Sequence, residues 1–236
     1  PYVQELKNNY SEFEEVVAFF NKGENVVAIG DKKFSRPCYF VEPNFTEIFS
    51  IRMLHGTQDG LKEKYSILLS KSLADALVGD DPIGKLVKYN NRDELVVTGV
   101  YENFPENSVF AGIQMLIPVK YYFTLNDYSK NLETSWGALD ASMYFVLQEG
   151  ASWEATETKI KDFLYSKTTD AVKAVKPQAL LQPMSRMNLY AEFKDGKNVG
   201  GKIRFVWMFV IVGAFVLLLA CINFMNLSTA RSAGRA

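Results

Sequence analysis

The sequence predicts a mixed α+β domain followed by a single C-terminal transmembrane helix. Residues 205–222 form a run of 18 amino acids without a charged or strongly polar side chain. The roughly 200 residues ahead of this run have ordinary globular composition, enough for one large domain or two small lobes. Within them, helical spacing alternates with short β-rich runs and no segment repeats, which indicates a mixed fold.

The apolar run has the length of a membrane span. As an α-helix at about 1.5 Å per residue it covers roughly 27 Å, close to the thickness of the hydrocarbon layer of a bilayer. A buried core helix is the alternative, but such helices seldom lack a polar face over about five turns. We therefore predict a span over residues 203–227, which includes Phe205, Trp207, Leu217 and Ile222.

Two amides follow the apolar run. Asn223 and Asn226 are three positions apart and therefore share one face of a helix. Amides at the membrane edge can bond to a neighbouring helix, which would fit a bundle of several spans. They can equally mark the headgroup zone, and both interpretations stay open.

The charges exclude one class of partner but do not fix the orientation. The formal net charge is -1 and no basic block is interleaved with aromatic residues, so no nucleic-acid partner is expected. The cations nearest the run are Lys194, Lys197, Lys202 and Arg204 before it and Arg231 and Arg235 after it. That count alone would place the large domain in the cytoplasm, but the rule is weak beside long translocated domains.

The N-terminal part is predicted to pass from helix to strands. Apolar residues recur at helical spacing over residues 2–20, with one break. Two β-rich runs follow, over residues 26–29 and 37–41, and Gly30-Asp31-Lys32 between them supplies turn chemistry. Residues 43–45 then open a short helical turn.

The central section is predicted to hold a strand, a capped helix and a hairpin. Residues 65–69 have the composition of a strand, after which Ser70 is a suitable N-cap and Gly79 a left-handed helix end. One apolar stripe lies between them, at Leu73, Ala74, Leu77 and Val78. Further extended segments are expected over residues 86–89 and 95–101, joined by Asn90-Asn91, and over residues 113–119.

The final third is predicted to hold one strand and one helix before the span. The strand covers residues 143–147, and Ser152 is expected to cap the helix. The inward-facing residues of that helix are predicted to be Trp153, Ile160, Phe163 and Leu164. Residues 179–182 are expected to be extended, and the polar, glycine-containing stretch 194–202 to be a flexible approach to the membrane.

One stretch imitates a nucleotide-binding loop. Residues 79–85 match the first seven positions of a P-loop, but the eighth is Leu86, which lacks the hydroxyl that would hold magnesium. This loop leaves a helix and enters a strand, the reverse of a P-loop, and its Asp80 and Asp81 would repel a triphosphate. We expect a helix-ending turn without nucleotide.

The residue inventory disfavours catalysis. His55 is the single histidine, so most zinc sites and histidine-dependent triads or dyads lack a member. Cys38 lies among apolar residues and is expected to be buried, and Cys221 lies in the span, so the two are not expected to pair. We predict no catalytic, cofactor or metal site, and a protein that is not an enzyme.

A mid-chain stretch is rich in aromatic residues. It contains Tyr121, Tyr122, Phe123, Tyr128 and Trp136. Core packing explains such a stretch, and an exposed contact surface for another protein or an apolar ligand is the alternative.

Four segments and the C-terminal helix match a family pattern in order. They are residues 38–49 running on to Leu54-His55-Gly56, residues 67–79, residues 81–85, residues 96–108 and, after the span, residues 221–232. The first four resemble the MacB-like periplasmic core domain, and the last resembles the start of an FtsX-like permease of Bacteroidetes ABC transporters. The sequence departs from the family at His55-Gly56-Thr57, where Gly-Arg is common.

The resemblance implies a two-lobed periplasmic domain over residues 1–202. The lobe near the membrane would comprise about residues 1–36 and 140–202, and the inserted lobe about residues 37–139. Residues 228–236 would begin a cytoplasmic loop in which Arg231 and Arg235 approach an ATPase.

The resemblance also implies a non-catalytic permease subunit in the bacterial inner (cytoplasmic) membrane. ATP-driven movement of its helices would be relayed to periplasmic substrate handling, either export or the extrusion of lipoproteins or peptides. The implied partners are a cytoplasmic ATP-binding subunit, a second permease subunit in a dimer, membrane lipid, and a periplasmic adaptor or substrate. A ligand-binding ectodomain of a membrane-anchored sensor is the alternative from another class, and a membrane-anchored hydrolase is a third.

Overall fold

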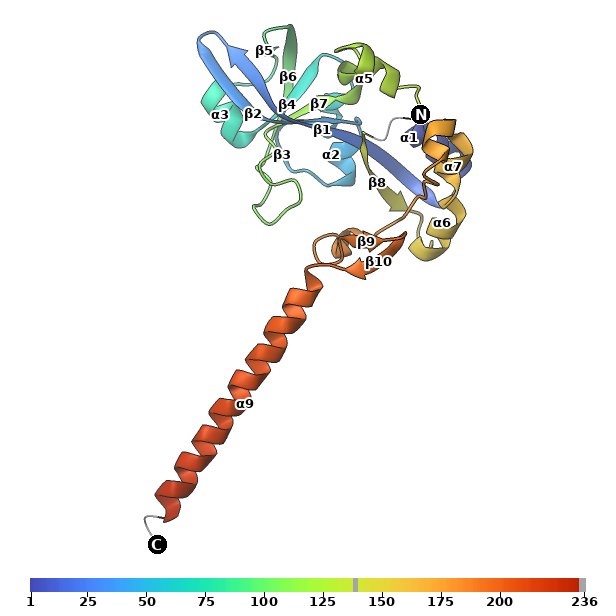
Figure 1. Ribbon diagram of the computed structural model, residues 1–236. Coiled ribbons are helices and arrows are strands. Elements are labelled where there is room, and N and C mark those ends of the chain that lie inside the picture. The colour runs from blue at the N-terminus through green and yellow to red at the C-terminus, as the bar shows by residue number, and fades with distance from the viewer. Residues whose placement is uncertain (138–139, 234–236) are drawn as a thin grey trace. The chain divides into compact units, whose positions relative to one another are not determined.

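The computed structural model describes residues 1–137 and 140–233 (Figure 1). Contacts divide the chain into two compact units. The sheet unit consists of Pro1–Ser152 and Leu164–Pro177, and the membrane-helix unit consists of Trp153–Phe163 and Gln178–Ala236.

The sheet unit contains one mixed sheet with short helices around it. Its strands are β1 (Phe13–Ile29), β2 (Lys32–Val41), β3 (Met53–Gly56), β4 (Ser66–Ser70), β5 (Leu86–Tyr89), β6 (Asp93–Tyr101), β7 (Met115–Pro118) and β8 (Ser142–Leu147). Its helices are α1 (Tyr2–Asn9), α2 (Phe45–Ile48), η1 (Gln58–Leu61), α3 (Lys71–Leu77), α4 (Val119–Tyr122), α5 (Asp127–Leu132) and α8 (Asp170–Lys173). The predicted α+β class is confirmed.

The strand pairings close on themselves. The order β2-β7-β4-β6-β5-β1 returns to its start because β1 also pairs with β2. Val27 of β1 lies opposite both Phe34 of β2 and Tyr89 of β5. The first half of β1 continues beyond this ring and pairs with β8, from Phe13 opposite Leu147 onward. Closure removes the free edges of the ring strands, which would otherwise be open to pairing with another chain.

An extra residue in β1 lets it serve two cores. Its register against β2 shifts by one between Asn21 and Glu24. Such a bulge moves all later side chains to the opposite face. Phe19 accordingly packs in one apolar cluster, whereas Val27, which has the same parity, packs in the other. Both faces of the sheet are thereby buried.

The predicted helix over residues 2–20 is wrong in its second half. Helix α1 ends at Asn9, and Phe13–Ile29 is the long strand β1. Five consecutive side chains, residues 16–20, are buried, because β1 is covered on both faces. A strand of this kind lacks the alternation that marks a half-buried strand, so its apolar run imitated helical spacing.

The central section was predicted closely. The Ser70 hydroxyl caps α3 by accepting the Leu73 N–H at 3.3 Å, and Gly79 ends the helix at φ +79. The β5–β6 hairpin turns at Asn90 and Asn91, both at positive φ, as a type I′ turn requires.

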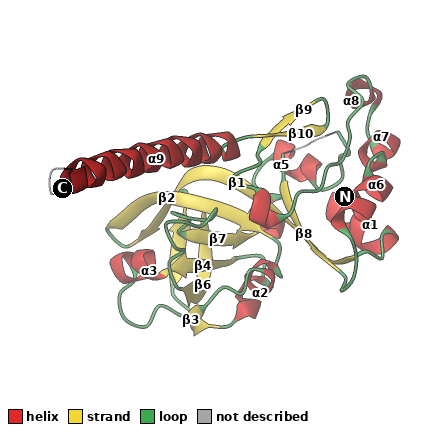
Figure 2. Cartoon of the chain, turned by 90° about the horizontal axis from the view of Figure 1, so that it is seen from below, coloured by secondary structure: helices red, strands yellow, loops and turns green. Residues whose placement is uncertain are grey.

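The membrane-helix unit contains α6 (Trp153–Ile160), η2 (Met184–Arg186), the hairpin of β9 (Glu192–Lys194) and β10 (Lys197–Gly200), and α9 (Ile203–Ala233). Helix α7 (Phe163–Lys167) crosses the boundary between the units. Its first residue, Phe163, belongs to the membrane-helix unit, and the remaining residues belong to the sheet unit. Figure 2 shows α9 as one uninterrupted helix.

The flexible approach predicted for residues 194–202 is wrong. A β-hairpin occupies most of it, and Lys194 and Lys197 face each other across its turn. Asp195 and Gly196 both adopt positive φ (50° and 71°), which again builds a two-residue hairpin turn. The expected extended segment at residues 179–182 belongs to neither described sheet.

A glycine pair tests the close approach of β3 to β6. Gly56 of β3 pairs with Gly99 of β6 and adopts a φ of +76°. A Cβ added to Gly56 would lie 2.3 Å from the Thr98 carbonyl oxygen. We expect Gly56→Ala to lower the free energy of unfolding by about 3 kcal/mol or more. Chemical denaturation in detergent, followed by circular dichroism, measures it.

Gly30→Ala is the matched control, because Gly30 also has positive φ (54°) but nothing lies within 4 Å of its added Cβ. It should cost only the left-handed backbone penalty, about 1–2 kcal/mol. Equal losses in the two variants would contradict the close packing of Gly56 against β6.

Candidate functional site

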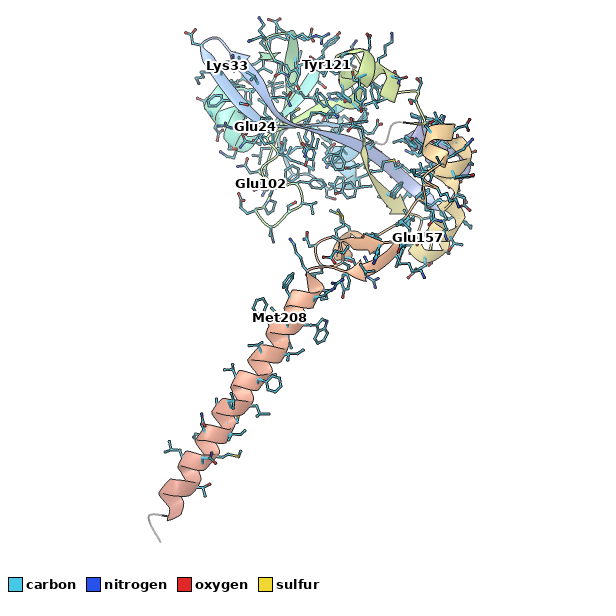
Figure 3. The ribbon with its side chains drawn as sticks, in the orientation of Figure 1. Glu24, Lys33, Glu102, Tyr121, Glu157 and Met208 are labelled. Atoms are coloured by element: carbon cyan, nitrogen blue, oxygen red, sulfur yellow. The ribbon has the colours of Figure 1, made fainter. Side chains whose placement is uncertain are left out.

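The candidate site is helix α9 together with the segment that anchors its first turn. Residues Ile203–Thr229 of α9 form a 27-residue stretch that is long enough and apolar enough to cross a membrane. None of the most apolar part of this stretch is buried in the described protein. Figure 3 shows its side chains, Met208 among them, pointing away from the helix. At about 1.5 Å per residue the stretch measures roughly 40 Å, enough for a bilayer core with margin.

The span residues predicted from sequence all lie on this helix with exposed side chains. Phe205, Trp207 and Leu217 are 59%, 62% and 67% exposed, and Ile222 is 38% exposed. Apolar surface all around a helix, without a polar stripe, is typical of a membrane span. The assignment of these four residues to lipid remains a prediction.

The remaining predicted residues follow on the same helix. Asn223 and Asn226 are exposed on α9, so their proposed contact with a second helix stays a prediction. Arg231 belongs to the last turns of α9 by its backbone, and Arg235 lies outside the described residues. The approach of these two arginines to an ATPase likewise stays a prediction.

The first turn of α9 is tied to the chain ahead of it. The first N–H groups of an α-helix have no partner within the helix, and a membrane offers none. Here the Ile203 N–H donates to the Leu189 carbonyl at 3.1 Å, and the Arg204 N–H donates to the Gly201 carbonyl at 3.1 Å. The helix start is thereby satisfied before it enters the span.

Side-chain contacts of Arg204 add to this anchor. Its guanidinium donates to the Val199 carbonyl at 2.7 Å and pairs with the Glu192 carboxylate at 3.1 Å. Both charged side chains are more than half exposed, so the ion pair itself adds no more than about 1 kcal/mol. The ion pair joins the first turn of α9 to the first residue of β9.

A glycine permits this close packing. Gly201 is buried at φ +136, and a Cβ there would lie 3.0 Å from the Leu189 carbonyl oxygen and 3.1 Å from the Ala191 nitrogen. Any other residue would therefore have to push the Leu189–Ala191 segment away from the start of α9.

Residues 179–181, which precede that segment in the chain, are bonded to α6 and to the residue that follows it. The Glu157 carboxylate, labelled in Figure 3, accepts the Leu181 N–H at 2.7 Å. The Lys161 carbonyl accepts the Ala179 N–H at 3.0 Å. Gln182, the residue after Leu181, donates its side-chain amide to the Tyr190 carbonyl at 2.8 Å, so this stretch links α6 to the segment that holds the start of α9.

The contacts that hold the start of α9 were not predicted from the sequence. The elements involved are three residues long or little more, and the bonds between them are long-range. One signal was available, since Asp195-Gly196 is a typical type I′ turn pair between short extended segments. The Glu157 and Arg204 contacts leave no such local pattern.

The P-loop imitation is a turn, as predicted. It follows α3 and leads into β5, and its Gly84 N–H donates to the Val97 carbonyl at 2.8 Å. A P-loop needs such N–H groups free to cradle phosphates. Asp81, at φ +53, and the neighbouring Asp80 are both exposed and add negative charge.

The other candidate groups for chemistry are dispersed. Cys38 is fully buried, and desolvation raises the pKa of its thiol, which opposes a nucleophilic thiolate. His55 is exposed on β3. Within residues 1–137 and 140–233, no three His, Cys, Asp or Glu side chains gather in a way that could hold a metal ion.

The mid-chain aromatic residues divide between the two alternatives. Tyr121 and Tyr122 are buried in the first core cluster, and the Tyr121 hydroxyl donates to Asp93 at 2.8 Å. Phe123 packs against that cluster from a partly exposed position, and Tyr128 is 59% exposed. Core packing therefore explains most of the stretch.

These features define a class: a mixed α+β domain anchored to a membrane-length helix. The family profile that matches is the MacB-like periplasmic core domain, over residues 1–163. The chain belongs to this family and is a periplasmic domain, so the resemblance predicted from sequence is confirmed. No curated protein matches the chain.

Solved structures share the fold at low sequence identity. One is a domain of a protein described as a permease from Porphyromonas gingivalis, with TM-score 0.60 and 22% identity, covering 71% of this chain and 76% of that one. Another is the periplasmic region of MacB from Actinobacillus actinomycetemcomitans, with TM-score 0.51 and 17% identity, covering 74% and 80%. A third is the extracellular domain of the noncanonic ABC-type transporter YknZ from Gram-positive bacteria, with TM-score 0.51 and 20% identity, covering 72% and 84%.

A charge in mid-span tests the membrane role of α9. Leu217→Arg should cost about 3–4 kcal/mol of insertion free energy. We expect the purified wild-type chain to stay with lipid vesicles through an alkaline carbonate wash and flotation, and the variant to be largely stripped. Leu86→Arg, at a half-exposed position on β5, is the control and should float like wild type. Retention of Leu217→Arg would argue that α9 does not span.

The turn at residues 79–85 predicts the absence of nucleotide binding. Calorimetric titration of the chain with ATP and magnesium should give no saturable heat. Leu86→Ser, which supplies the missing hydroxyl, should also bind nothing, because the Gly84 N–H remains bonded to Val97. Saturable binding by either protein would contradict this geometry.

Proposed function

We propose that this chain is the periplasmic domain of an ABC transporter permease subunit, with α9 as its first membrane helix of the FtsX-like type. Residues 1–202 would lie in the periplasm of a bacterium, and the membrane would be the inner one. The domain itself would be non-catalytic and would relay ATP-driven helix movement to periplasmic substrate handling. The family match and the names of the structural neighbours support this assignment.

The observation that supports the proposed relay is the set of hydrogen bonds and the ion pair at the first turn of α9. A shift or rotation of the helix acts on Leu189 through the Ile203 N–H and on Glu192 through Arg204. The bond from the Gln182 amide to the Tyr190 carbonyl connects the Leu189–Ala191 segment to residues 181–182, and the Leu181–Glu157 bond connects these to α6. These contacts join short, well-defined elements, so a displacement of the helix is passed on instead of being absorbed by a flexible linker.

The proposal names partners at both ends of the helix. A cytoplasmic ATP-binding subunit would supply the movement, and the segment containing Arg231 and Arg235 would lead toward it. A second permease subunit would contact the Asn223 and Asn226 face of α9. A periplasmic adaptor or substrate would receive the movement, either for export or for extrusion of a lipoprotein or peptide.

The proposed domain organisation has two lobes. About residues 1–36 and 140–202 would form the lobe near the membrane, and about residues 37–139 the inserted lobe. Residues 203–227 would be the span and residues 228–236 the start of the cytoplasmic loop. These boundaries rest on the family resemblance.

Gly201→Ala tests the relay, because the added Cβ would separate Leu189 from the start of α9. The experiment uses the full-length permease with its ATPase in lipid nanodiscs. Spin labels at Lys161→Cys and Lys33→Cys report on the two units, in a Cys221→Ser background. We expect ATP to shift the distance distribution between the labels in the wild type and this shift to be lost in Gly201→Ala.

Gly213→Ala is the control, because nothing lies within 4 Å of a Cβ at that position in α9. It should respond to ATP like the wild type. A wild-type distribution that ignores ATP would overturn the relay. A distribution that instead responds to a periplasmic ligand without the ATPase would favour the sensor ectodomain.

A further inference from the structure

The membrane-helix unit carries a pocket beside the base of α9. Its volume is about 460 Å³. It combines apolar walls with two cations, and its lining includes Trp153, Leu181, Arg186, Tyr190, Phe193 and Lys197. Neither the family assignment nor the proposed relay gives this pocket a role.

The two cations of the pocket have no acidic partner. In the described part of the chain, no carboxylate oxygen lies within 4.0 Å of the Arg186 guanidinium or the Lys197 amine. Arg186 lies over the rings of Trp153 and Tyr190, at 5.7 and 5.8 Å from their centroids. The carboxylate of Glu157, which also lines the pocket, is engaged by the Leu181 N–H. The two cations outnumber this single carboxylate, so the pocket carries net positive charge beside aromatic faces.

The surroundings of the pocket have the character of a membrane interface. Exposed apolar side chains occur there at Leu180, Met184, Leu189, Phe193 and Val199. Three cations, Arg186, Lys194 and Lys197, lie among them in the sequence, and such a mixture is typical of residues at the level of lipid headgroups.

The pocket is also close to the span along the chain. Lys197 and Ile203 are six positions apart, which spans no more than about 20 Å even when the chain is extended. The Asn198 side chain, which lines the pocket, bonds to Tyr190, and the next-door Leu189 carbonyl holds the first turn of α9.

We propose that this pocket binds the anionic headgroup of a phospholipid from the leaflet in which α9 begins. The phosphate would lie between Arg186 and Lys197, and the glycerol and upper acyl chains would contact Phe193 and Leu180. This assignment rests on the proposed placement of α9 in the membrane. It would make the relay sensitive to lipid composition, because the bound lipid touches both α6 and the β9–β10 hairpin.

Trp153 provides the readout. The chain is purified in neutral detergent with Trp136→Phe and Trp207→Phe, so that Trp153 is the remaining tryptophan of the three. Short-chain phosphatidylglycerol, short-chain phosphatidylcholine, glycerol 3-phosphate and an oligoglutamate peptide are titrated in separate arms. We expect saturable fluorescence change with phosphatidylglycerol at the lowest concentration, and at least tenfold weaker responses in the other arms.

Charge variants locate the site. Arg186→Gln with Lys197→Gln should weaken phosphatidylglycerol binding by about fivefold for each cation removed. Arg36→Gln with Lys33→Gln on β2 is the matched control, since Arg36 also lies over a ring, that of Phe34, and the charge change is the same. Arg186→Lys keeps the charge and should retain most of the binding if the phosphate is the ligand.

The outcomes separate the alternatives. Equal binding of the two phospholipids, or a loss as large in the β2 control as in the pocket variant, would overturn the proposal. Binding of glycerol 3-phosphate as tight as phosphatidylglycerol would assign the site to a soluble phosphate, and preference for oligoglutamate would assign it to an acidic peptide. Carbonate-resistant flotation of the same proteins reports independently on the span, so failure of the lipid site and failure of the membrane assignment are distinguishable.

Discussion

The structure depends on one constraint: the apolar surface of α9 has no protein partner within the described chain and needs an apolar environment, which we propose is a lipid bilayer. A helix in lipid cannot leave its first N–H groups unbonded, because each would cost several kcal/mol there. The base of α9 meets that need with the Leu189 and Gly201 carbonyls. The same bonds attach the base of α9 to the chain ahead of it within the membrane-helix unit, so under the proposed relay anchoring and mechanical coupling would have one physical origin.

The sheet unit is stabilised differently, by a closed ring of strands and two apolar clusters. Its ring of paired strands and two apolar clusters leave no free strand edge within the ring, and the bulge near Asn21 directs β1 into both cores. Such a body resists deformation, because native packing is dense and strand register is fixed by the buried faces. Under the proposed relay, such a domain would benefit from stiffness more than from a reactive centre. The burial of Cys38 and the bonded turn at residues 79–85 are consistent with that emphasis.

The structural neighbours share this fold at 17–22% identity, so they establish the architecture and not the cargo. What a particular member handles must be decided by surfaces that vary between members. In this chain we propose the pocket of the membrane-helix unit as such a surface, where Arg186 lies over aromatic rings and Lys197 lines the same pocket. Lipid at that position would act on the same elements that carry the relay.

The sequence alone determined the membrane helix, the α+β class, the Ser70 cap and the Asn90-Asn91 hairpin. Each of these depends on residues close together in the chain: continuous apolarity, a hydroxyl three residues before an N–H, or two residues that tolerate positive φ. Only the tertiary structure decided that residues 13–20 are a strand, because burial on both faces erased the alternation that would have marked it. It also decided the anchor of α9, since the bonds of Ile203 to Leu189, Arg204 to Glu192 and Leu181 to Glu157 join segments whose proximity no local pattern encodes.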